Sequence, residues 1–319
     1  MNSGNPSEAV HIENLTKRFD DLTAVQDLDL RIKGGAMCAL VGPDGAGKTT
    51  TIRMMCGIIP PSEGSVRVLG LDVQRNRREL KHKIGYLSQG FSLYEDLSID
   101  ENIEFFAEIH QVKDFKSRRN ELLEFTRLTP FRTRLAGRLS GGMKKKLALA
   151  CTLVHRPEVI FLDEPTTGVD PVSRRDFWLI LSQVLSDGVS IVVSTPYLDE
   201  AERCSQVGLL SSGRLLASDT PSGMHGRMEG HIIEFTLSDV RTAAAALPQE
   251  PTPWCMEVQL FGDRLDVRCK DVEVSLQKIR ARFLEAGVEI FDARQVAPSL
   301  ENVFISMLRR EEATHNDGQ

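Results

Sequence analysis

Residues 42–49 read Gly-Pro-Asp-Gly-Ala-Gly-Lys-Thr, a G-x-x-x-x-G-K-T pattern, and this stretch decides the fold. It follows the apolar segment Met37 to Val41, which predicts a strand, and it precedes a segment rich in Thr, Ile and Met, which predicts a helix. In such a unit the glycines let successive backbone N–H groups point at a phosphate, and the positive end of the helix dipole strengthens the attraction. The sequence therefore predicts a phosphate-binding loop.

The charged and hydroxyl residues at two strand ends indicate the chemistry. Lys48 would bind β- and γ-phosphate oxygens of a nucleotide, and Thr49 would bind Mg²⁺. A second signal is Val159-Ile-Phe-Leu-Asp-Glu-Pro165, an apolar run that predicts a buried parallel strand ending in two carboxylates. Asp163 suits the carboxylate that holds Mg²⁺ through water, and Glu164 suits the one that polarises the attacking water.

A third signal is Leu139-Ser-Gly-Gly142, at the start of a helical stretch that runs to Val154. Ser140 is a good N-cap, and Gly141 and Gly142 leave backbone N–H groups accessible, so this helix start can receive an anion. Alone, the stretch would be interpreted as an ordinary capped helix. Together with the first two signals, it predicts a further contact with a nucleotide.

The composition is that of a globular protein. Hydrophobic residues make up 41% and charged residues 26% of the 319 residues, which excludes disordered and collagen-like chains. The formal net charge of −6 argues against binding to nucleic acid. No apolar stretch has the length of a membrane span and no secretory signal is visible, so we expect a cytoplasmic protein without direct bilayer insertion. The six cysteines lie apart, without a Cys-x-x-Cys pair, which predicts buried free thiols.

Short apolar segments alternate with helical patterns at residues 8–225, which predicts an α/β domain built on a parallel sheet. The first strands resemble an antiparallel β annex. Three helical stretches without a good strand predict a helical subdomain over about residues 91–156. The expected strands are Val10–Ile12, Ala24–Ile32, Met37–Val41, Ser65–Leu69, Ile84–Leu87, Val159–Leu162, Ser190–Ser194, Val207–Leu210 and Arg214–Ala217, and the expected subdomain helices are Asp100–His110, Ser117–Leu128 and Gly142–Val154.

A stretch rich in Gly, Pro and Met at residues 221–230 marks a domain boundary near residue 225. The pattern that follows is β-α-β-β-α-β, which predicts a small C-terminal ferredoxin-like α+β domain at residues 230–310. A last helix over Leu300–Arg309 precedes the polar residues 311–319, which we expect to form a disordered tail.

At the three signals the chain resembles the ATP-binding subunits of ABC transporters, whose core is a P-loop NTPase fold, and the similarity covers nearly all of residues 8–225. Residues 42–49 look like the family's Walker A loop, residues 159–164 like its Walker B strand and residues 139–142 like its signature motif. The resemblance implies that the ligands are ATP and Mg²⁺.

Three further matches imply roles for single residues. Gln89, in the segment Ile84-Gly-Tyr-Leu-Ser-Gln89, is similar to the Q-loop glutamine that touches Mg²⁺ and the attacking water. Asp170 lies in a segment like the family's D-loop, and Phe19 lies where the family stacks an aromatic ring on adenine. The resemblance implies that Glu164 and Gln89 are catalytic, that Thr49, Gln89 and Asp163 hold the metal, and that ATP is contacted by Phe19, Gly42, Pro43, Asp44, Gly45, Ala46, Gly47, Lys48, Thr49, Thr50, Ser140, Gly141, Gly142 and Asp170.

The family's mechanism implies a head-to-tail dimer, in which ATP on one subunit's Walker A loop is closed by the other subunit's signature helix. Closure would pull on membrane permease subunits, which places the chain at the inner face of the cell membrane. The segments Tyr197–Cys204 and Ala297–Phe304 resemble exporters of the drug and antibiotic (multidrug) type. The resemblance thus implies an ATPase that powers export, as a homodimer or heterodimer. The alternatives are a soluble translation or repair factor and a nucleotide-sensing module that does not hydrolyse ATP.

Two positions depart from the family pattern. Met143 stands where the signature usually has Gln, and we expect a mild effect because Ser140 and the glycine N–H groups make the phosphate contact. Pro196 stands where the family has its switch histidine, and proline has no side-chain donor for the γ-phosphate or water. We expect Pro196 to begin a helix capped by Thr195, and to leave ATP binding intact while slowing hydrolysis by about two to three decades.

Two stretches leave their role open. Phe91–Leu97 lies where the family docks its membrane partner, so exposed apolar side chains there would mark an interface. Burial of Tyr94 and Leu97 would instead make the stretch part of the subdomain core. The run Lys144–Lys146 predicts a solvated helix face, and we assign it no role.

Overall fold

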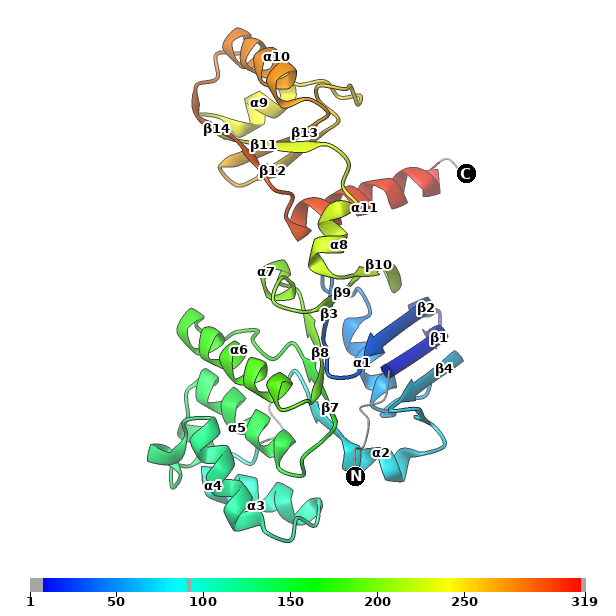
Figure 1. Cartoon of the computed structure of the whole chain (residues 1–319), viewed down its shortest axis with the longest axis vertical. Helices are drawn as coiled ribbons and strands as arrows, with labels where there is room; N and C mark the ends of the chain where they lie inside the picture. The colour runs from blue at the N-terminus through cyan, green and yellow to red at the C-terminus, as the bar shows by residue number, and fades with distance from the viewer. Residues whose placement is uncertain (1–7, 91–92, 317–319) are drawn as a thin grey trace. The chain divides into compact units, whose positions relative to one another are not determined.

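The computed structural model describes residues 8–90 and 93–316 and divides into two compact units (Figure 1). Unit 1 is Met1–Thr220 and unit 2 is Pro221–Gln319. The division falls close to the boundary expected near residue 225. Each unit has its own hydrophobic core.

The parallel sheet of unit 1 carries the strands that the sequence expects to end at the site. Its order in the described residues is β10-β9-β3-β8-β7-β6, and β10 alone runs antiparallel to its neighbour. Every residue of β3, β7 and β8 is buried, as expected for a parallel sheet covered on both faces. The strands are β3 (Met37–Val41), β6 (Ile84–Leu87), β7 (Val159–Asp163), β8 (Ser190–Thr195), β9 (Gln206–Ser211) and β10 (Arg214–Asp219).

A second, antiparallel sheet has the order β2-β1-β4-β5, which is the annex that the sequence predicts. Its strands are β1 (Glu8–Phe19), β2 (Leu22–Lys33), β4 (Glu63–Val68) and β5 (Leu71–Asp72). β1 is longer than the expected Val10–Ile12, because the residues that follow continue to pair with β2 through several irregularities of register. Phe19 therefore lies at the end of a long hairpin.

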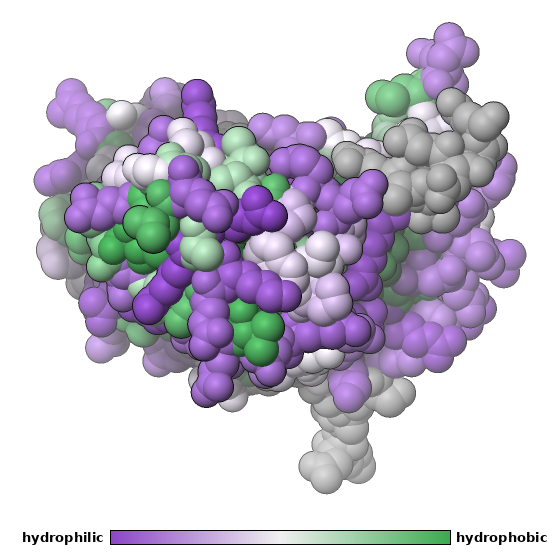
Figure 2. All heavy atoms as spheres, turned by 90° about the horizontal axis from the view of Figure 1, so that it is seen from above, coloured by the Kyte–Doolittle hydropathy of each residue, from purple (hydrophilic) through white to green (hydrophobic). Residues whose placement is uncertain are grey.

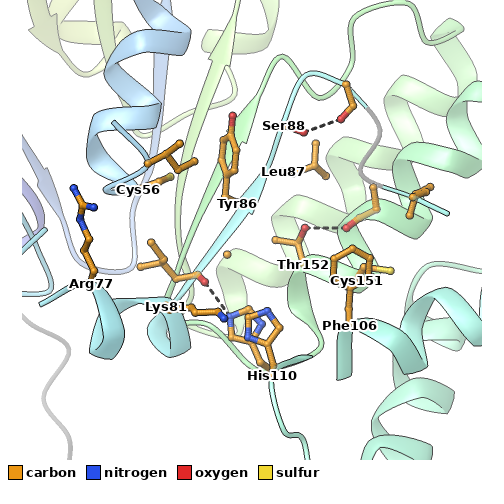
Figure 3. Close-up of a pocket in the computed structure, with 17 residues that line it drawn as sticks. Cys56, Arg77, Lys81, Tyr86, Leu87, Ser88, Phe106, His110, Cys151 and Thr152 are labelled. Atoms are coloured by element: carbon orange, nitrogen blue, oxygen red, sulfur yellow. Dashed lines mark hydrogen bonds between the residues drawn. The ribbon is translucent and has the colours of Figure 1, made fainter. Parts of the chain in front are cut away.

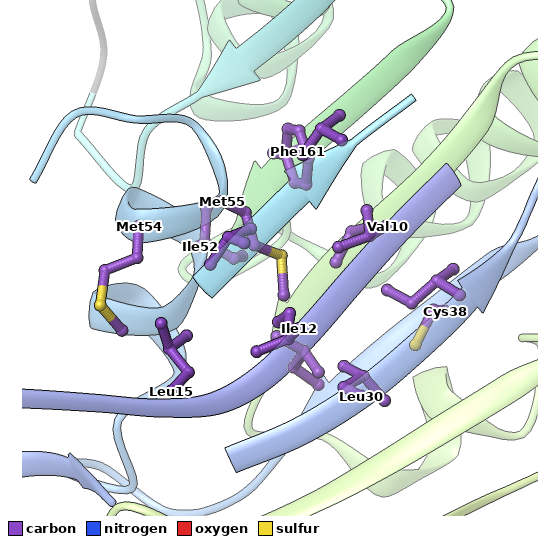
Figure 4. Close-up of a cluster of buried hydrophobic side chains, with 14 of the residues drawn as sticks. Val10, Ile12, Leu15, Leu30, Cys38, Ile52, Met54, Met55 and Phe161 are labelled. Carbon is purple, nitrogen blue, oxygen red and sulfur yellow. The ribbon is translucent and has the colours of Figure 1, made fainter. Parts of the chain in front are cut away.

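Helix α1 (Lys48–Met55) is fixed by the core between the two sheets. Figure 4 shows Ile52 and Met55 of α1 among side chains of the antiparallel sheet and Phe161 of β7. These side chains are fully buried, and removing one from such a core typically costs about 2–5 kcal/mol. The start of α1 at Lys48 is thereby held at the carboxyl end of β3.

The helical subdomain is formed by α3 (Ile99–Ile109), α4 (Phe115–Phe125) and α5 (Gly141–Leu153), which contact one another. Ser98 and Glu101 form a capping box that begins α3. Between residues 93 and 156 the structure has no named strand, as the sequence predicts. The other helical elements of unit 1 are α2 (Arg77–Lys83), α6 (Pro171–Ser186), α7 (Leu198–Ala201) and the 3₁₀ turns Thr129–Phe131 and Ala136–Arg138.

Unit 2 is an antiparallel sheet with helices, in the element order β-α-β-β-α-β that the sequence predicts. The sheet order is β12-β13-β11-β14, and Phe235 meets Phe283 edge to face in its core, with ring centroids 5.5 Å apart. Its elements are α8 (Pro221–Gly226), β11 (His231–Leu237), α9 (Val240–Ala246), β12 (Glu257–Phe261), β13 (Arg264–Cys269), α10 (Val272–Glu285), β14 (Ile290–Val296) and α11 (Leu300–Asn316).

The prediction of a disordered tail from residue 311 is wrong for residues 311–316. Helix α11 continues to Asn316, because the sequence Glu-Glu-Ala that begins this segment has high helix propensity. Residues 317–319 lie outside the described residues.

Searched over residues 8–90 and 93–316, no helix is both long and apolar enough to span a membrane. On the face shown in Figure 2, hydrophilic residues predominate and hydrophobic ones form separate small patches. All six cysteines are free thiols, and five are buried while Cys56 is half-buried.

Candidate functional site

The loop of residues 42–49 takes its shape from close packing of its glycines. A Cβ atom on Gly42 would lie 2.2 Å from the carbonyl oxygen of Leu210 in β9. Gly47 has φ 93°, and a Cβ atom there would lie 2.6 Å from the carbonyl oxygen of Ala24 in β2. Only glycine fits these two positions, so β2 and β9 together force the loop to curl at the start of α1.

Lys48 is a buried cation at the centre of the loop. Its Nζ donates to the carbonyl oxygens of Gly42, at 2.8 Å, and Pro43, at 2.9 Å, and lies 3.5 Å from Oε1 of Glu164. The side chain is only 3% exposed. The structure therefore brings the predicted lysine and the predicted catalytic carboxylate together across the mouth of the loop.

Asp163 accepts two hydroxyl hydrogen bonds on one oxygen. Thr49 Oγ1 donates to its Oδ1 at 2.9 Å, and Ser194 Oγ, at the end of β8, donates to the same atom at 2.7 Å. The other oxygen, Oδ2, is buried and has no hydrogen-bond partner in the described residues. The sequence pattern predicts Ser194 only as the end of a strand and not as part of the site, although a polar residue near the end of an apolar strand was a usable signal.

Glu164 occupies a strained position beside Asp163. Its φ is 47°, in the left-handed region that non-glycine residues seldom adopt, and its N–H is held by the carbonyl oxygen and Oγ of Ser194. Gln89 Nε2 donates to Oε2 of Glu164 at 2.9 Å. The predicted pair of catalytic residues thus forms a direct hydrogen bond, with the carboxylate buried.

Ser140 begins α5 as expected, accepting a hydrogen bond from the N–H of Met143 at 3.3 Å. Ser140 and Gly141 are exposed, and a Cβ atom on Gly141 would meet nothing nearer than 4.0 Å. Gly142 differs, because a Cβ atom there would lie 2.4 Å from the side chain of Ser173 in α6. Gly142 therefore lets α5 pack tightly on α6, whereas Ser140 and Gly141 present an open helix start.

Two predicted nucleotide contacts, Asp170 and Phe19, come from segments outside the 42–49 loop. Asp170 is the N-cap of α6, accepting from the N–H groups of Val172 and Ser173, and the hydrogen bonds with Ser173 hold the pKa of its carboxyl below its usual value. Phe19 is 44% exposed, and the Lys17 ammonium stands 4.8 Å over its ring. In the rest of the loop Pro43, Asp44 and Gly45 are exposed, Ala46 is buried and Thr50 is half-buried.

Comparison with known proteins shows the family of the chain. A family sequence model described as ABC transporter matches residues 25–167, which include the loop, the start of α5 and Asp163. The daunorubicin resistance ATP-binding protein DrrA2 of Streptomyces coeruleorubidus is 32% identical over 94% of each chain. The chain belongs to the ATP-binding proteins of ABC transporters. It is similar to the ATP-binding proteins of a multidrug transporter and of drug resistance.

A second relative is more similar in sequence but longer. The probable multidrug ABC transporter ATP-binding protein YbhF of Escherichia coli (strain K12) is 47% identical over 94% of this chain. The cassette chain spans about half, 52%, of the length of that relative.

Solved structures of ABC transporter ATP-binding proteins match about two thirds of this chain. One described as the ATP-binding subunit of an ABC transporter has a TM-score of 0.63 at 26% identity and covers 69% of this chain and 92% of its own. A dimeric cassette in a post-hydrolysis state, described as bound to ADP and phosphate, has a TM-score of 0.61 at 26% identity, over 66% of this chain and 98% of its own.

Beyond the cassette motifs, a buried carboxylate network holds the segment after β8. Glu200 in α7 is fully buried, and its Oε1 accepts from Thr166 Oγ1, Arg174 Nε and Trp178 Nε1. Its Oε2 accepts from Thr195 Oγ1. Breaking such a buried ionic network typically costs about 3–5 kcal/mol. This network could not be predicted from the sequence, because its members meet only in the folded chain.

The structure corrects the helix predicted to begin at Pro196. Helix α7 begins at Leu198, its N-cap is Tyr197 without a side-chain cap bond, and Pro196 precedes that cap. Thr195 Oγ1 does accept from the N–H of Tyr197, but its bond to the buried Glu200 holds residues 195–197 as a turn, and the helix begins only after this turn. Pro196 is thus a half-buried residue of a fixed turn, beside Ser194 and Thr195.

A separate cavity of about 280 Å³ lies beside Tyr86 and Ser88 of the segment that leads to Gln89 (Figure 3). In its lining His110 and His155 stack with ring centroids 3.8 Å apart. Burial lowers the pKa of His110 to about 4, and the nearby charges of His155, Lys81 and His82 act in the same direction. Nδ1 of both stacked rings is buried without a partner in the described residues.

The histidine stack predicts acid sensitivity of unit 1. The unfolded chain protonates His110 near pH 6.5 and the folded chain near about 4, so the unfolded state binds more protons between these values. The free energy of unfolding should therefore fall as the pH falls through this window. The variant His110→Phe keeps a ring against His155 but cannot titrate at this position, so its free energy of unfolding should fall less over the same pH range. Denaturant unfolding at several pH values measures both slopes, and equal slopes would contradict the prediction.

Proposed function

We propose that this chain is the ATP-binding and ATP-hydrolysing subunit that powers export of a substrate through partner membrane permease subunits. The observation that carries the proposal is the meeting of the 42–49 loop with Asp163 and Glu164 at the carboxyl ends of β3 and β7. A buried cation, a hydroxyl and two carboxylates at one point are the groups that phosphoryl transfer needs. Membership of the ABC transporter family supports the coupling of that chemistry to transport.

ATP is the nucleotide that we assign to the loop. The first N–H groups of α1 have no partner within the helix and attract phosphate oxygens, as does the positive end of its dipole. Lys48 would exchange its bonds to the carbonyls of Gly42 and Pro43 for charge-assisted bonds to phosphate, which are stronger. The exposed ring of Phe19 would stack on adenine. Asp44, Gly45, Ala46, Gly47 and Thr50 would complete the loop around the phosphates.

The residues at the loop fit Mg²⁺. This ion prefers oxygen ligands, and Oδ2 of Asp163 is a buried acceptor without a partner in the described residues. We assign Thr49, Asp163 and Gln89 as the residues that would hold it. When bound there, Mg²⁺ neutralises charge on the phosphate oxygens.

Glu164 is the residue that we assign to orient the attacking water. Gln89 and Lys48 hold its carboxylate, and Ser194 fixes its backbone. A carboxylate held in this way can accept a hydrogen bond from water and align it with the γ-phosphate. Its strained backbone is the kind of distortion that clusters at catalytic positions.

A second cassette would complete each site. Ser140, Gly141 and Gly142 at the start of α5, with Asp170 at the start of α6, are the residues that we assign to the partner's ATP. The exposed, capped start of α5 is suited to an anion. Likeness to a solved dimeric cassette supports a dimer, which we propose to be head-to-tail, with either a second copy or a related ATPase subunit.

We infer that the exporter is of the drug and antibiotic type, with the chain peripheral on the cytoplasmic face of the membrane. The names of two relatives, one a multidrug transporter protein and one a daunorubicin resistance protein, support this class of substrate. Unit 2, which we interpret as a ferredoxin-like domain, would have a regulatory or dimer-stabilising role.

The assignment of the loop is tested by Lys48→Ala. Removing the cation should weaken ATP affinity about 100-fold, because charge-assisted bonds to two phosphate groups are lost. Calorimetric titration with MgATP measures the change. Lys116→Ala, at an exposed position of α4, is the control and should bind as the wild type does. Unchanged affinity of Lys48→Ala would overturn the proposed function.

The role of Pro196 is tested by introducing a side-chain hydrogen-bond donor at this position. Pro196→His should raise the hydrolysis rate about 100-fold, since one preformed donor to the transition state commonly contributes two to three decades. Pro196→Ala removes the ring without adding a donor and should not raise the rate. Glu164→Gln should abolish hydrolysis in both backgrounds. Wild-type turnover at tens per second, not raised by Pro196→His, would show that proline does not slow the enzyme.

Permease docking is tested at Tyr94, which is 46% exposed and meets Phe105 edge to face. Leu97 is half-buried, and Phe91 lies outside the described residues. The exposed ring favours the interface interpretation, so Tyr94→Asp should release the protein from membranes that contain its permease. Leu284→Asp, which changes an exposed apolar residue of unit 2, should remain bound. Equal retention of both variants, or sedimentation of the wild type with ribosomes, would argue against the interface.

A further inference from the structure

The three lysines of α5 are not a uniform solvated face. Lys144 Nζ lies 2.7 Å from a carboxylate oxygen of Glu95, and Lys146 Nζ lies 2.9 Å from one of Asp176 in α6. These two are ordinary ion pairs near the surface, whose net contribution to stability is about 0–1 kcal/mol each. The lysine between them has a different environment.

Lys145 points into the protein. The residue is 4% exposed, and its Nζ donates to the main-chain carbonyl oxygen of Gln89 at 3.2 Å. Burial lowers the pKa of its ammonium, while the negative charges of Asp163 and Glu164 raise it. The ammonium therefore lies within electrostatic reach of both carboxylates of the site. A buried charge is expensive, so its retention here needs a reason.

The bond to Gln89 connects α5 to the catalytic carboxylate. Lys145 holds the main chain of Gln89, and the side chain of Gln89 donates to Oε2 of Glu164 at 2.9 Å. Five residues earlier on the same helix, Ser140 caps the start of α5. At 1.5 Å per residue, only about 7.5 Å of rigid helix separates the two positions. A small shift of α5 must therefore act on Gln89.

We propose that Lys145 is a positioning residue that ties the main chain of Gln89 to helix α5 and thereby sets the side chain of Gln89 against Glu164. The inference rests on the proposed function, in which Ser140 meets the nucleotide of a second cassette. It adds a physical link between that contact and the carboxylate of the same chain. In this proposal Lys145 acts on the reaction through the main chain of Gln89 and takes no part in the bond changes itself.

This dependence can be tested by a double-mutant cycle in the full-length protein. Lys145→Met removes the charge at similar length and should lower the kcat for MgATP about tenfold, with KM changed less than twofold. Gln89→Ala removes the side chain that Lys145 positions. In that background Lys145→Met should lower kcat less than twofold, because nothing is left to position. Lys145→Arg should restore most of the rate, since guanidinium can also bond a carbonyl.

Lys146→Met is the matched control on the same helix, and its kcat should stay within twofold of the wild type. Circular dichroism checks that each variant folds, and Lys145→Gln replaces Lys145→Met in the cycle if the latter does not. Unchanged kcat in Lys145→Met, or an equal loss in both backgrounds, would overturn the proposal. If the wild type neither binds nor hydrolyses ATP, both the proposed function and the proposal for Lys145 fail. If the wild type hydrolyses ATP and Lys145→Met has the same kcat, only the proposal for Lys145 is overturned.

Discussion

Oδ1 of Asp163 accepts hydrogen bonds from Thr49 and Ser194, and the rest of the site depends on this arrangement. The three residues come from the ends of different elements, and the parallel register of β3, β8 and β7 brings these ends to one level. A slip of one residue would turn every side chain of a strand to the opposite face. In these strands, which are buried on both faces, such a slip would disrupt the close packing of the core on both sides of the sheet.

A short series of hydrogen bonds connects Asp163 and its neighbour Glu164 to helix α5. The backbone of Glu164 is fixed by Ser194, its side chain is held by Gln89, and the main chain of Gln89 is bonded to Lys145 of α5. The 42–49 loop, the carboxylate of Glu164 and helix α5 are therefore parts of one connected network. Such a network couples changes at the 42–49 loop to movement of the helical subdomain.

Local signals explain why the loop and the two carboxylates could be predicted from the sequence. The glycines of residues 42–49 and the acidic end of β7 are patterns within single segments. Glu200 and Lys145 acquire their roles from residues far away in the chain, so no local pattern identified them, and Ser194 had only the weak signal of a polar residue near the end of an apolar strand. Lys145 belongs to the run Lys144–Lys146, and a run of like charges on a helix predicts a solvated face. The start of α7 was misjudged because the Thr195 hydroxyl bonds to Glu200 instead of only capping a helix.

The chain has two tryptophans, Trp178 in unit 1 and Trp254 in unit 2. The indole N–H of Trp178 is buried and bonded to Glu200, the carboxylate that also holds the turn before Pro196. Trp254 is half-buried, with the Lys278 ammonium 5.7 Å from its ring. Because indole emission depends on polarity and hydrogen bonding, the native protein carries one optical reporter in each unit. When Trp254 is replaced, the intrinsic fluorescence of Trp178 alone can follow a rearrangement of the turn, and no label is needed.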